Sequence, residues 1–219
     1  MTEVVHSYGC NHYERYKVKL THQGEKCMEN EQLKIFDEYR NQIGVATRKD
    51  VHRLGYWHEA FHCWFISEEQ GTVYLYLQLR SNTKKDYANL LDITAAGHLL
   101  ANERVQDGVR EVKEEIGIDI SFQELIPLGI INYCVIREDF IDKEIANIFL
   151  YKSKKSLDDF TLQEEEVAGI VKAEFNHFAE LWFGERETIR IKGFEIKQDG
   201  TKTLIDENVG RNSYKHFSK

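Results

Sequence analysis

The sequence has one proline and four cysteines among its 219 residues, and its acidic side chains outnumber the basic ones by 37 to 29. A single proline excludes a proline-rich linker. The cysteines lack the spacing of a zinc site, and they are too few for a disulfide scaffold in a chain of this length. The formal charge of −8 argues against nonspecific binding of nucleic acid or of an anionic membrane, since both need excess positive charge. We expect neither as a partner.

Long hydrophobic runs are also missing. The first residues contain no apolar stretch of the kind that marks a secretory signal. The most apolar segment, residues 125–136, is too short to cross a bilayer and is interrupted by Pro127 and Gly129. We therefore expect a soluble, cytoplasmic protein with reduced thiols, whose oligomeric state the sequence leaves open.

The composition otherwise predicts a globular chain, with 42% hydrophobic and 12% aromatic residues. Its length suits one domain with appendages. Residues 1–30 are polar and lack a hydrophobic period, which predicts a loosely ordered extension. We expect the main domain at 31–185 and a C-terminal segment, 186–219, packed on that domain.

Hydrophobic patterning predicts more strands than helices. Residues 72–80 alternate cleanly between two faces, and Val109, Val112 and Ile116 form the buried stripe of a helix over 106–116, which Gly117 ends. Residues 37–44 read as a polar turn. Further strands are predicted at 33–36, 58–66, 125–136, 145–151 and 167–175, and a helix near 177–183. This pattern favours an α+β fold in which a few helices cover a mixed sheet.

The main chemical signal is a set of three glutamates on the helix over 106–116. Glu111, Glu114 and Glu115 are spaced by three and four residues, so they share roughly one face. Like charges at this spacing destabilise a helix unless a cation neutralises them. Oxygen ligands with open positions suit Mg²⁺ or Mn²⁺, which also accept phosphate oxygens. The glutamates alone leave open a merely solvated acidic face.

The surrounding string is more specific. Gly97, Glu103 and the run from Arg110 to Ile118, REVKEEIGI, resemble the Nudix box, G-x5-E-x7-R-E-U-x-E-E-x-G-U, the signature of Nudix hydrolases. Six residues rather than seven separate Glu103 from Arg110, which leaves the helix face intact but puts the placement of Glu103 in question. The resemblance implies an α/β/α sandwich with a mixed sheet between helices. It also implies metal-dependent hydrolysis of a small-molecule diphosphate substrate.

By that resemblance, Glu111 and Glu115 bind the principal metal ion, and Glu114 and the backbone carbonyl of Ala96 assist. The general base stays open between Glu103, Glu114 and an acid of the run 164–166. That run is equally typical of a solvated approach to a strand.

Over about residues 31–178 the chain is similar to the Nudix branch that contains type I isopentenyl-diphosphate isomerases and their hydrolase relatives. There, Arg80, Lys84 and Lys85 would match residues that grip the diphosphate. Without the family, the two lysines read as loop residues that favour solubility.

The same branch implies a second metal site built from three histidines and two acids. The corresponding residues here are His52, His58, His98, Asp142 and Glu144. Imidazole with carboxylate suits Mn²⁺ or Zn²⁺ better than Mg²⁺. Each histidine alone is more typical of a packed or surface residue. The other histidines, such as His62 and His177, receive no functional assignment.

Two features favour hydrolysis over isomerisation. The isomerases use a cysteine just before the Gly-His of the box, where this sequence has Ala96, and a methyl group cannot replace a thiol. The isomerases also have a degraded box, whereas the three glutamates are intact here. The sequence predicts cleavage of a nucleoside diphosphate derivative or a prenyl diphosphate by water attack on phosphorus. An isomerase-like enzyme and a non-catalytic nucleotide-sensing module are the alternatives.

Overall fold

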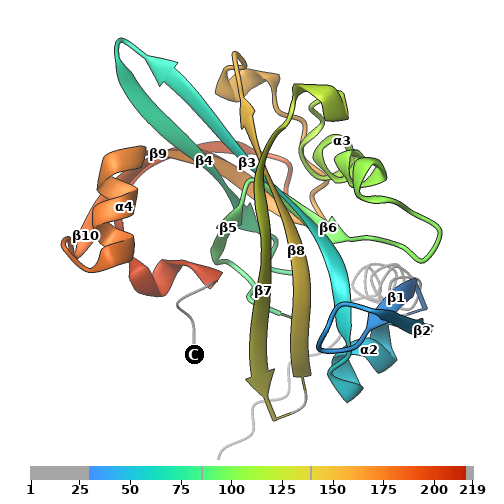
Figure 1. Ribbon diagram of the computed structural model, residues 1–219. Helices are drawn as coiled ribbons and strands as arrows, with labels where there is room; N and C mark the ends of the chain where they lie inside the picture. Colours follow the sequence, from blue (N-terminus) through green and yellow to red (C-terminus); the bar gives the residue numbers. More distant parts are fainter. Residues whose placement is uncertain (1–29, 85, 139, 216–219) are drawn as a thin grey trace, which may run out of the picture.

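The centre of the fold is strand β3, Trp57–Glu69, in a computed structural model that describes residues 30–84, 86–138 and 140–215 (Figure 1). Within this part of the chain β3 pairs with four strands. It is antiparallel to β1 (Gln32–Phe36), β4 (Thr72–Arg80) and β6 (Ala95–His98) and parallel to β8 (Phe140–Lys152). The extension predicted for residues 1–30 falls almost wholly outside the described residues.

The remaining strands extend the sheet on both sides of this centre. The path runs β11-β10-β9-β4-β3-β1-β2, while β5 pairs with β4, and β7 pairs with β8. These strands are β2 (Gln42–Thr47), β5 (Leu91–Ile93), β7 (Ile126–Arg137), β9 (Val167–Glu174), β10 (Thr188–Ile196) and β11 (Lys202–Gly210). Short 3-10 turns lie at Val105–Val109, Phe122–Glu124, Leu157–Asp159 and Arg211–Ser213.

Helices cover both faces of this mixed sheet, so the predicted α+β sandwich is confirmed. Helix α3 (Arg110–Ile116) buries Val112 and Ile116 in one core cluster, and α4 (Phe175–Phe183) buries Leu181 in another (Figure 1). The double cover explains why the middle of β4 is buried on both faces, with Leu75 and Leu77 on one face and Tyr76 and Gln78 on the other. Among the described residues, no helix combines the length and the apolar composition needed to cross a membrane.

The sheet forks between β3 and β4, and this fork creates the space for the site. The two strands pair only as far as Phe65 and Tyr76; beyond that point β6 pairs with β3, and β5 pairs with β4. The hydroxyl of Thr94 closes the fork, because it accepts the N–H of Phe65 at 3.0 Å and donates to the carbonyl of Tyr76 at 2.5 Å. Residues 91–98 are thereby fixed beside α3.

The helix predicted over 106–116 is instead a 3-10 turn followed by α3. Gly108 explains the tight turn, because a Cβ there would lie 2.7 Å from the ring of Phe61. Glycine also has a low helix propensity. Gly117 ends α3 in the left-handed conformation, with φ of 72°, as predicted.

Two other predictions need correction at their boundaries, and one helix was not predicted. The turn expected at 37–44 ends at Asn41, because β2 begins at Gln42. The strand expected through Phe175 stops at Glu174, because α4 begins at Phe175. Helix α2 (Arg48–Leu54) was not predicted, although Thr47 accepts the N–H of Asp50 as its N-cap and Gly55 is its left-handed C-cap.

The C-terminal segment continues the sheet rather than merely resting on it. Five residues of β10 pair with β9, and Ile191 and Ile189 are 2% exposed in the core that also holds Leu181.

Replacing Ile191 with alanine should lower the free energy of unfolding by about 2–5 kcal/mol, because it leaves a cavity in this core. Leu204→Ala on β11 is the matched control, since Leu204 is 82% exposed and its truncation should cost under about 0.5 kcal/mol. Urea unfolding measures both. A second, separate transition for residues 186–215 would contradict the single cooperative unit.

Candidate functional site

The three glutamates of α3 occupy different environments. Glu115 is buried, the side chain of Glu111 is 13% exposed, and that of Glu114 is 54% exposed. The first two therefore face the sheet, and the third lies at the rim. Only Glu111 and Glu115 of the trio are enclosed well enough to hold an ion away from bulk water.

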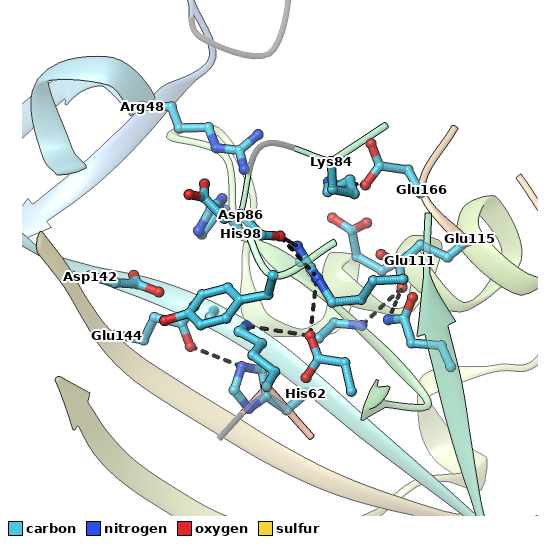
Figure 2. Close-up of a pocket in the computed structure, with 18 of the residues that line it drawn as sticks. Arg48, His62, Lys84, Asp86, His98, Glu111, Glu115, Asp142, Glu144 and Glu166 are labelled. Atoms are coloured by element: carbon cyan, nitrogen blue, oxygen red, sulfur yellow. Dashed lines mark hydrogen bonds and ion pairs between the residues drawn. The ribbon is translucent and has the colours of Figure 1, made fainter. Parts of the chain in front are cut away.

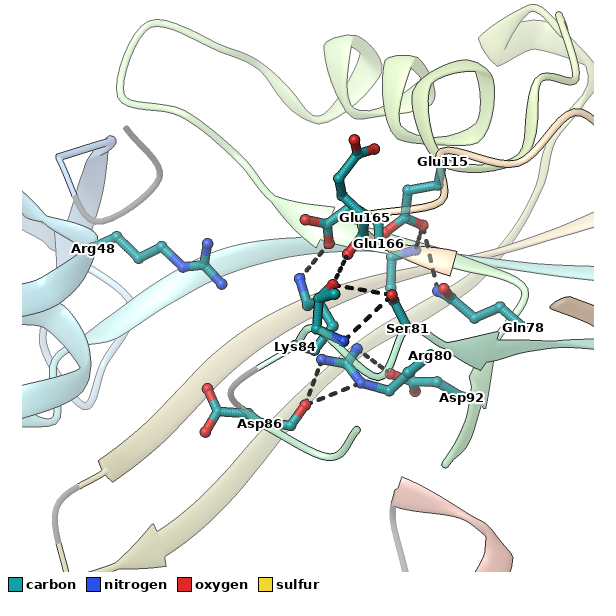
Figure 3. A network of polar contacts seen from close by, with 12 residues as sticks. Arg48, Gln78, Arg80, Ser81, Lys84, Asp86, Asp92, Glu115, Glu165 and Glu166 are labelled. Carbon is teal, nitrogen blue, oxygen red and sulfur yellow. Dashed lines mark hydrogen bonds and ion pairs between the residues drawn. The ribbon is translucent and has the colours of Figure 1, made fainter. Parts of the chain in front are cut away.

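The turn at the end of β6 is fitted to these two carboxylates. The N–H of Ala96 donates to Oε2 of Glu115 at 3.0 Å, and the Gln78 amide donates to the same oxygen at 3.4 Å (Figure 3). A Cβ on Gly97 would lie 2.2 Å from the carboxylate of Glu111, so only glycine leaves that side chain in place. Ala96 thus contacts Glu115 through its N–H, and the metal-binding role of its carbonyl stays a prediction.

Arg110 ties the helix to the preceding loop. Its guanidinium donates to both carboxylate oxygens of Glu103, to Oε2 of Glu114 at 2.9 Å and to the carbonyl of His98 at 3.2 Å. It also lies 2.7 Å from Oε1 of Glu111. Glu103 in turn accepts the N–H of Leu100 at 2.8 Å. The residue missing from the box is therefore absorbed in the loop, and Glu103 is placed by a bidentate pair.

Burial disfavours the ionised forms of the Glu111 and Glu115 carboxylates. Desolvation raises the pKa of Glu111 to about 7, although Arg110 opposes the shift. Desolvation and the charge of Glu111 raise the pKa of Glu115 well above its usual value. A divalent cation would favour their ionised forms. The donor set, two carboxylates beside a backbone turn, fits Mg²⁺ or Mn²⁺.

A second cluster lies at the other side of the same cleft. Ligand atoms of His52, His58, His98 and Asp142 all lie within 4.8 Å of one another. Helix α2 supplies His52, β3 His58, β6 His98 and β8 Asp142. Four elements distant in sequence thus converge on one point.

The cluster has the features of a metal site. The Nδ1 atoms of His52 and His58 contact the carbonyls of Arg48 and Tyr56, which leaves both Nε2 atoms near Asp142 at 3.6 and 3.7 Å. His58 Nε2 and Asp142 Oδ1 are buried without a hydrogen-bond partner. Burial lowers the pKa of His58 and, more strongly, of His98, which keeps both rings in the neutral form that binds metal.

Glu144 does not join this group. It contacts Nε2 of His62 at 3.0 Å instead (Figure 2). Burial opposes ionisation of Glu144, but the His62 contact and nearby cations outweigh it and lower its pKa. The structure thus brings together four of the five residues suggested as ligands, and it places His62, which received no functional assignment, beside the cleft.

The basic residues of the cleft are each paired with acids. Arg80 donates to Asp92 at 3.0 Å and to the carbonyl of Asp86, and Lys84 pairs with Glu166 (Figure 3). Lys85, the third predicted phosphate-binding residue, lies outside the described residues.

Apart from Glu103 and His58, these groups line one cleft of about 260 Å³ (Figure 2). Among the described residues, nine carboxylate and five basic side chains line it, a formal balance of −4 with neutral histidines. The acids are Glu31, Asp86, Asp92, Glu111, Glu114, Glu115, Asp142, Glu144 and Glu166, and the bases are Arg48, Arg80, Lys84, Arg110 and Lys215. Such a cleft repels an anion unless cations accompany it.

Comparison with known proteins identifies the family. No family model matches the chain. An uncharacterised Nudix hydrolase of Clostridium acetobutylicum is 38% identical over 192 residues, which cover 85% of this chain and 91% of that protein. The chain belongs to the Nudix hydrolase family.

Two further proteins are similar to this chain. Isopentenyl-diphosphate Delta-isomerase 2 of Photorhabdus laumondii is 28% identical over 127 residues, 58% of this hydrolase and 69% of the isomerase. A crystal structure of a Deinococcus radiodurans protein covers 70% of this hydrolase and 90% of that chain, with a TM-score of 0.54. At 18% identity, this last likeness bears on the fold alone.

Sequence reasoning missed several residues that line the cleft, among them Gln78, Asp92 and Lys215. The signal that could have identified Gln78 is a polar side chain in the middle of a strand that is buried. Lys215 carried no signal, because it reaches the cleft only through the packing of the C-terminal segment.

The raised pKa of Glu111 predicts a pH dependence of stability in EDTA. The folded protein holds this proton more tightly than the unfolded chain, whose pKa is near 4.5. Its stabilising contribution is therefore complete below about pH 4.5, and it is lost as the pH rises through about 7. Urea unfolding at several pH values should show that Glu111→Gln loses less unfolding free energy than the wild type as the pH rises through about 7. Glu185→Gln, at an exposed position, should follow the wild type. Parallel profiles for all three proteins would contradict the assignment.

Proposed function

We propose that this Nudix hydrolase cleaves a diphosphate linkage in a metal-dependent reaction in which water attacks phosphorus. The substrate class is a nucleoside diphosphate derivative or a prenyl diphosphate, and the cation is Mg²⁺ or Mn²⁺. The observation that carries the proposal is the buried pair Glu111 and Glu115, held against the β6 turn at the floor of an acidic cleft. The similarity to an isopentenyl-diphosphate isomerase favours the prenyl class as the first to test.

The residues of the site have two kinds of role, metal binding and positioning. Glu111 and Glu115 would hold the principal ion with the Ala96 turn, and Glu114 would assist from the rim. A divalent cation bound there supplies positive charge to the phosphate oxygens and lowers the pKa of a bound water. Arg110 and Glu103 keep α3 in register with the turn, which makes them positioning residues.

Two acids remain as candidates for the general base. Glu103 is engaged at both oxygens by Arg110, which argues against its accepting a proton. Glu114 lies at the rim, and Glu166 lines the cleft beside Lys84. Lys84 and Arg80 flank the same space, where they would orient the diphosphate for in-line attack.

Thiol chemistry of the isomerase type is not supported. Of the two cysteines in the described part of the chain, neither lines the cleft. Burial raises the pKa of Cys63 to about 12, which keeps its thiol protonated in the core. The retained carboxylates likewise argue against a sensor that only binds nucleotides.

Glu115→Gln should lower kcat/KM for the best diphosphate by at least about 100-fold at saturating Mg²⁺, because it removes a buried anionic oxygen. Phosphate or monophosphate release from nucleoside diphosphate derivatives, dinucleoside polyphosphates and prenyl diphosphates measures this. Glu185→Gln is the matched control. A loss smaller than about tenfold would remove Glu115 from the site, and allylic product without phosphate release would indicate isomerisation.

A glycine pair provides an independent check on the geometry. In the same phosphate-release assay, Gly97→Ala should lower kcat/KM about as much as Glu115→Gln does, since the added methyl group displaces the Glu111 carboxylate. Gly44→Ala should not, because a Cβ at that position meets only Ile35 at an ordinary 3.7 Å.

The histidine cluster should bind Mn²⁺ or Zn²⁺ independently of α3. In a Glu115→Gln background, metal at 100 times its Kd should stabilise the protein by about 2.7 kcal/mol. Asp142→Asn should abolish that stabilisation, measured by thermal unfolding. His177→Ala, which changes a half-buried histidine of α4 outside the cluster, should leave it intact. Equal stabilisation in all three proteins would refute a site at Asp142.

A further inference from the structure

The C-terminal segment places a lysine in the cleft. After β11, Tyr214 is 2% exposed in the core, and Arg211 donates to the carbonyl of Leu181 at 2.7 Å. Tyr214 also forms a parallel bridge with Leu91. The residues that follow these two in the sequence, Lys215 and Asp92, therefore lie side by side. The side chain of Lys215 is 12% exposed and lines the same cleft as the glutamates of α3.

Lys215 shares its acidic partner with another cation. Its Nζ lies 3.4 Å from Oδ2 of Asp92, and Nη1 of Arg80 donates to that same oxygen at 3.0 Å. One carboxylate thus faces two positive charges. Arg80 is also fixed by two bonds to the carbonyl of Asp86. An ammonium group on a flexible stem is the more adaptable donor of the two.

The surroundings of Lys215 locate it at one side of the cleft. Its charge acts on Asp142 and Glu144 of β8 and on His98 of β6. Figure 2 shows Asp142 and Glu144 across the cleft from Glu111 and Glu115. Lys215 therefore brings positive charge to the part of the cleft that holds the acids of β8.

We propose that Lys215 is a substrate-binding residue whose ammonium group contacts a phosphate oxygen of the diphosphate on the β8 side of the cleft. The inference rests on the proposed function and extends it, because it makes the C-terminal segment part of the site. The competing role for Lys215 is purely structural: neutralising Asp92.

Inorganic pyrophosphate with Mg²⁺ tests this by calorimetry. Lys215→Gln should raise its Kd by about tenfold or more, as expected for loss of a hydrogen bond between charged groups. KM for the best diphosphate should rise in parallel, and Lys215→Arg should recover part of the affinity. Lys192→Gln, at a half-exposed lysine on β10, should match the wild type. A Kd for Lys215→Gln within twofold of wild type would overturn the inference.

A charge-balanced double variant separates contact from neutralisation. If Lys215 touches phosphate, Asp92→Asn with Lys215→Gln should bind pyrophosphate more weakly than Asp92→Asn alone. Equal affinity of the double variant and Asp92→Asn would overturn the contact. Wild-type protein that binds pyrophosphate through Lys215 but hydrolyses no diphosphate would uphold the inference and refute the proposed function. Wild-type protein that neither binds nor hydrolyses would refute both.

Discussion

The burial of Glu111 and Glu115 on one face of α3 is the constraint from which the rest of the site follows. Removing a carboxylate from water disfavours its charged form, and a second one beside it adds to the cost. Arg110 cannot offset both, because its guanidinium also serves Glu103 and Glu114. A site that needs these anions must therefore obtain positive charge from outside the chain.

That constraint is met only because the sheet forks. If β3 and β4 paired along their whole length, residues 91–98 would have no place, and α3 would pack on a continuous sheet. The single hydroxyl of Thr94 satisfies polar groups of both strands where they separate. Gly97 then allows the backbone to approach the Glu111 carboxylate more closely than any side chain would permit. The contacts of Thr94 and the absence of a side chain at Gly97 thus determine how closely the backbone approaches the acidic face of α3.

Periodic and contiguous signals made much of this molecule predictable from sequence. The alternation in β4, the α3 stripe ending at Gly117 and the acidic face of the box all appear in the structure. Contacts between residues that are distant in the sequence were harder to predict. Nothing local says that Glu144 contacts His62, since their pairing depends on the register between β3 and β8. The position of Lys215 was harder still to predict, because it depends on a bridge between Leu91 and Tyr214, which are 123 residues apart in the sequence.

The charge balance of the cleft also bears on what it recognises. Each of its five basic side chains is already ion-paired with a carboxylate, and four negative charges remain in formal excess. A diphosphate would add further negative charge to that excess. Basic side chains alone therefore cannot hold it, and the repulsion is removed only when divalent cations enter with or before the substrate. Under the proposed function, the cleft would therefore bind a metal–diphosphate complex rather than the free anion.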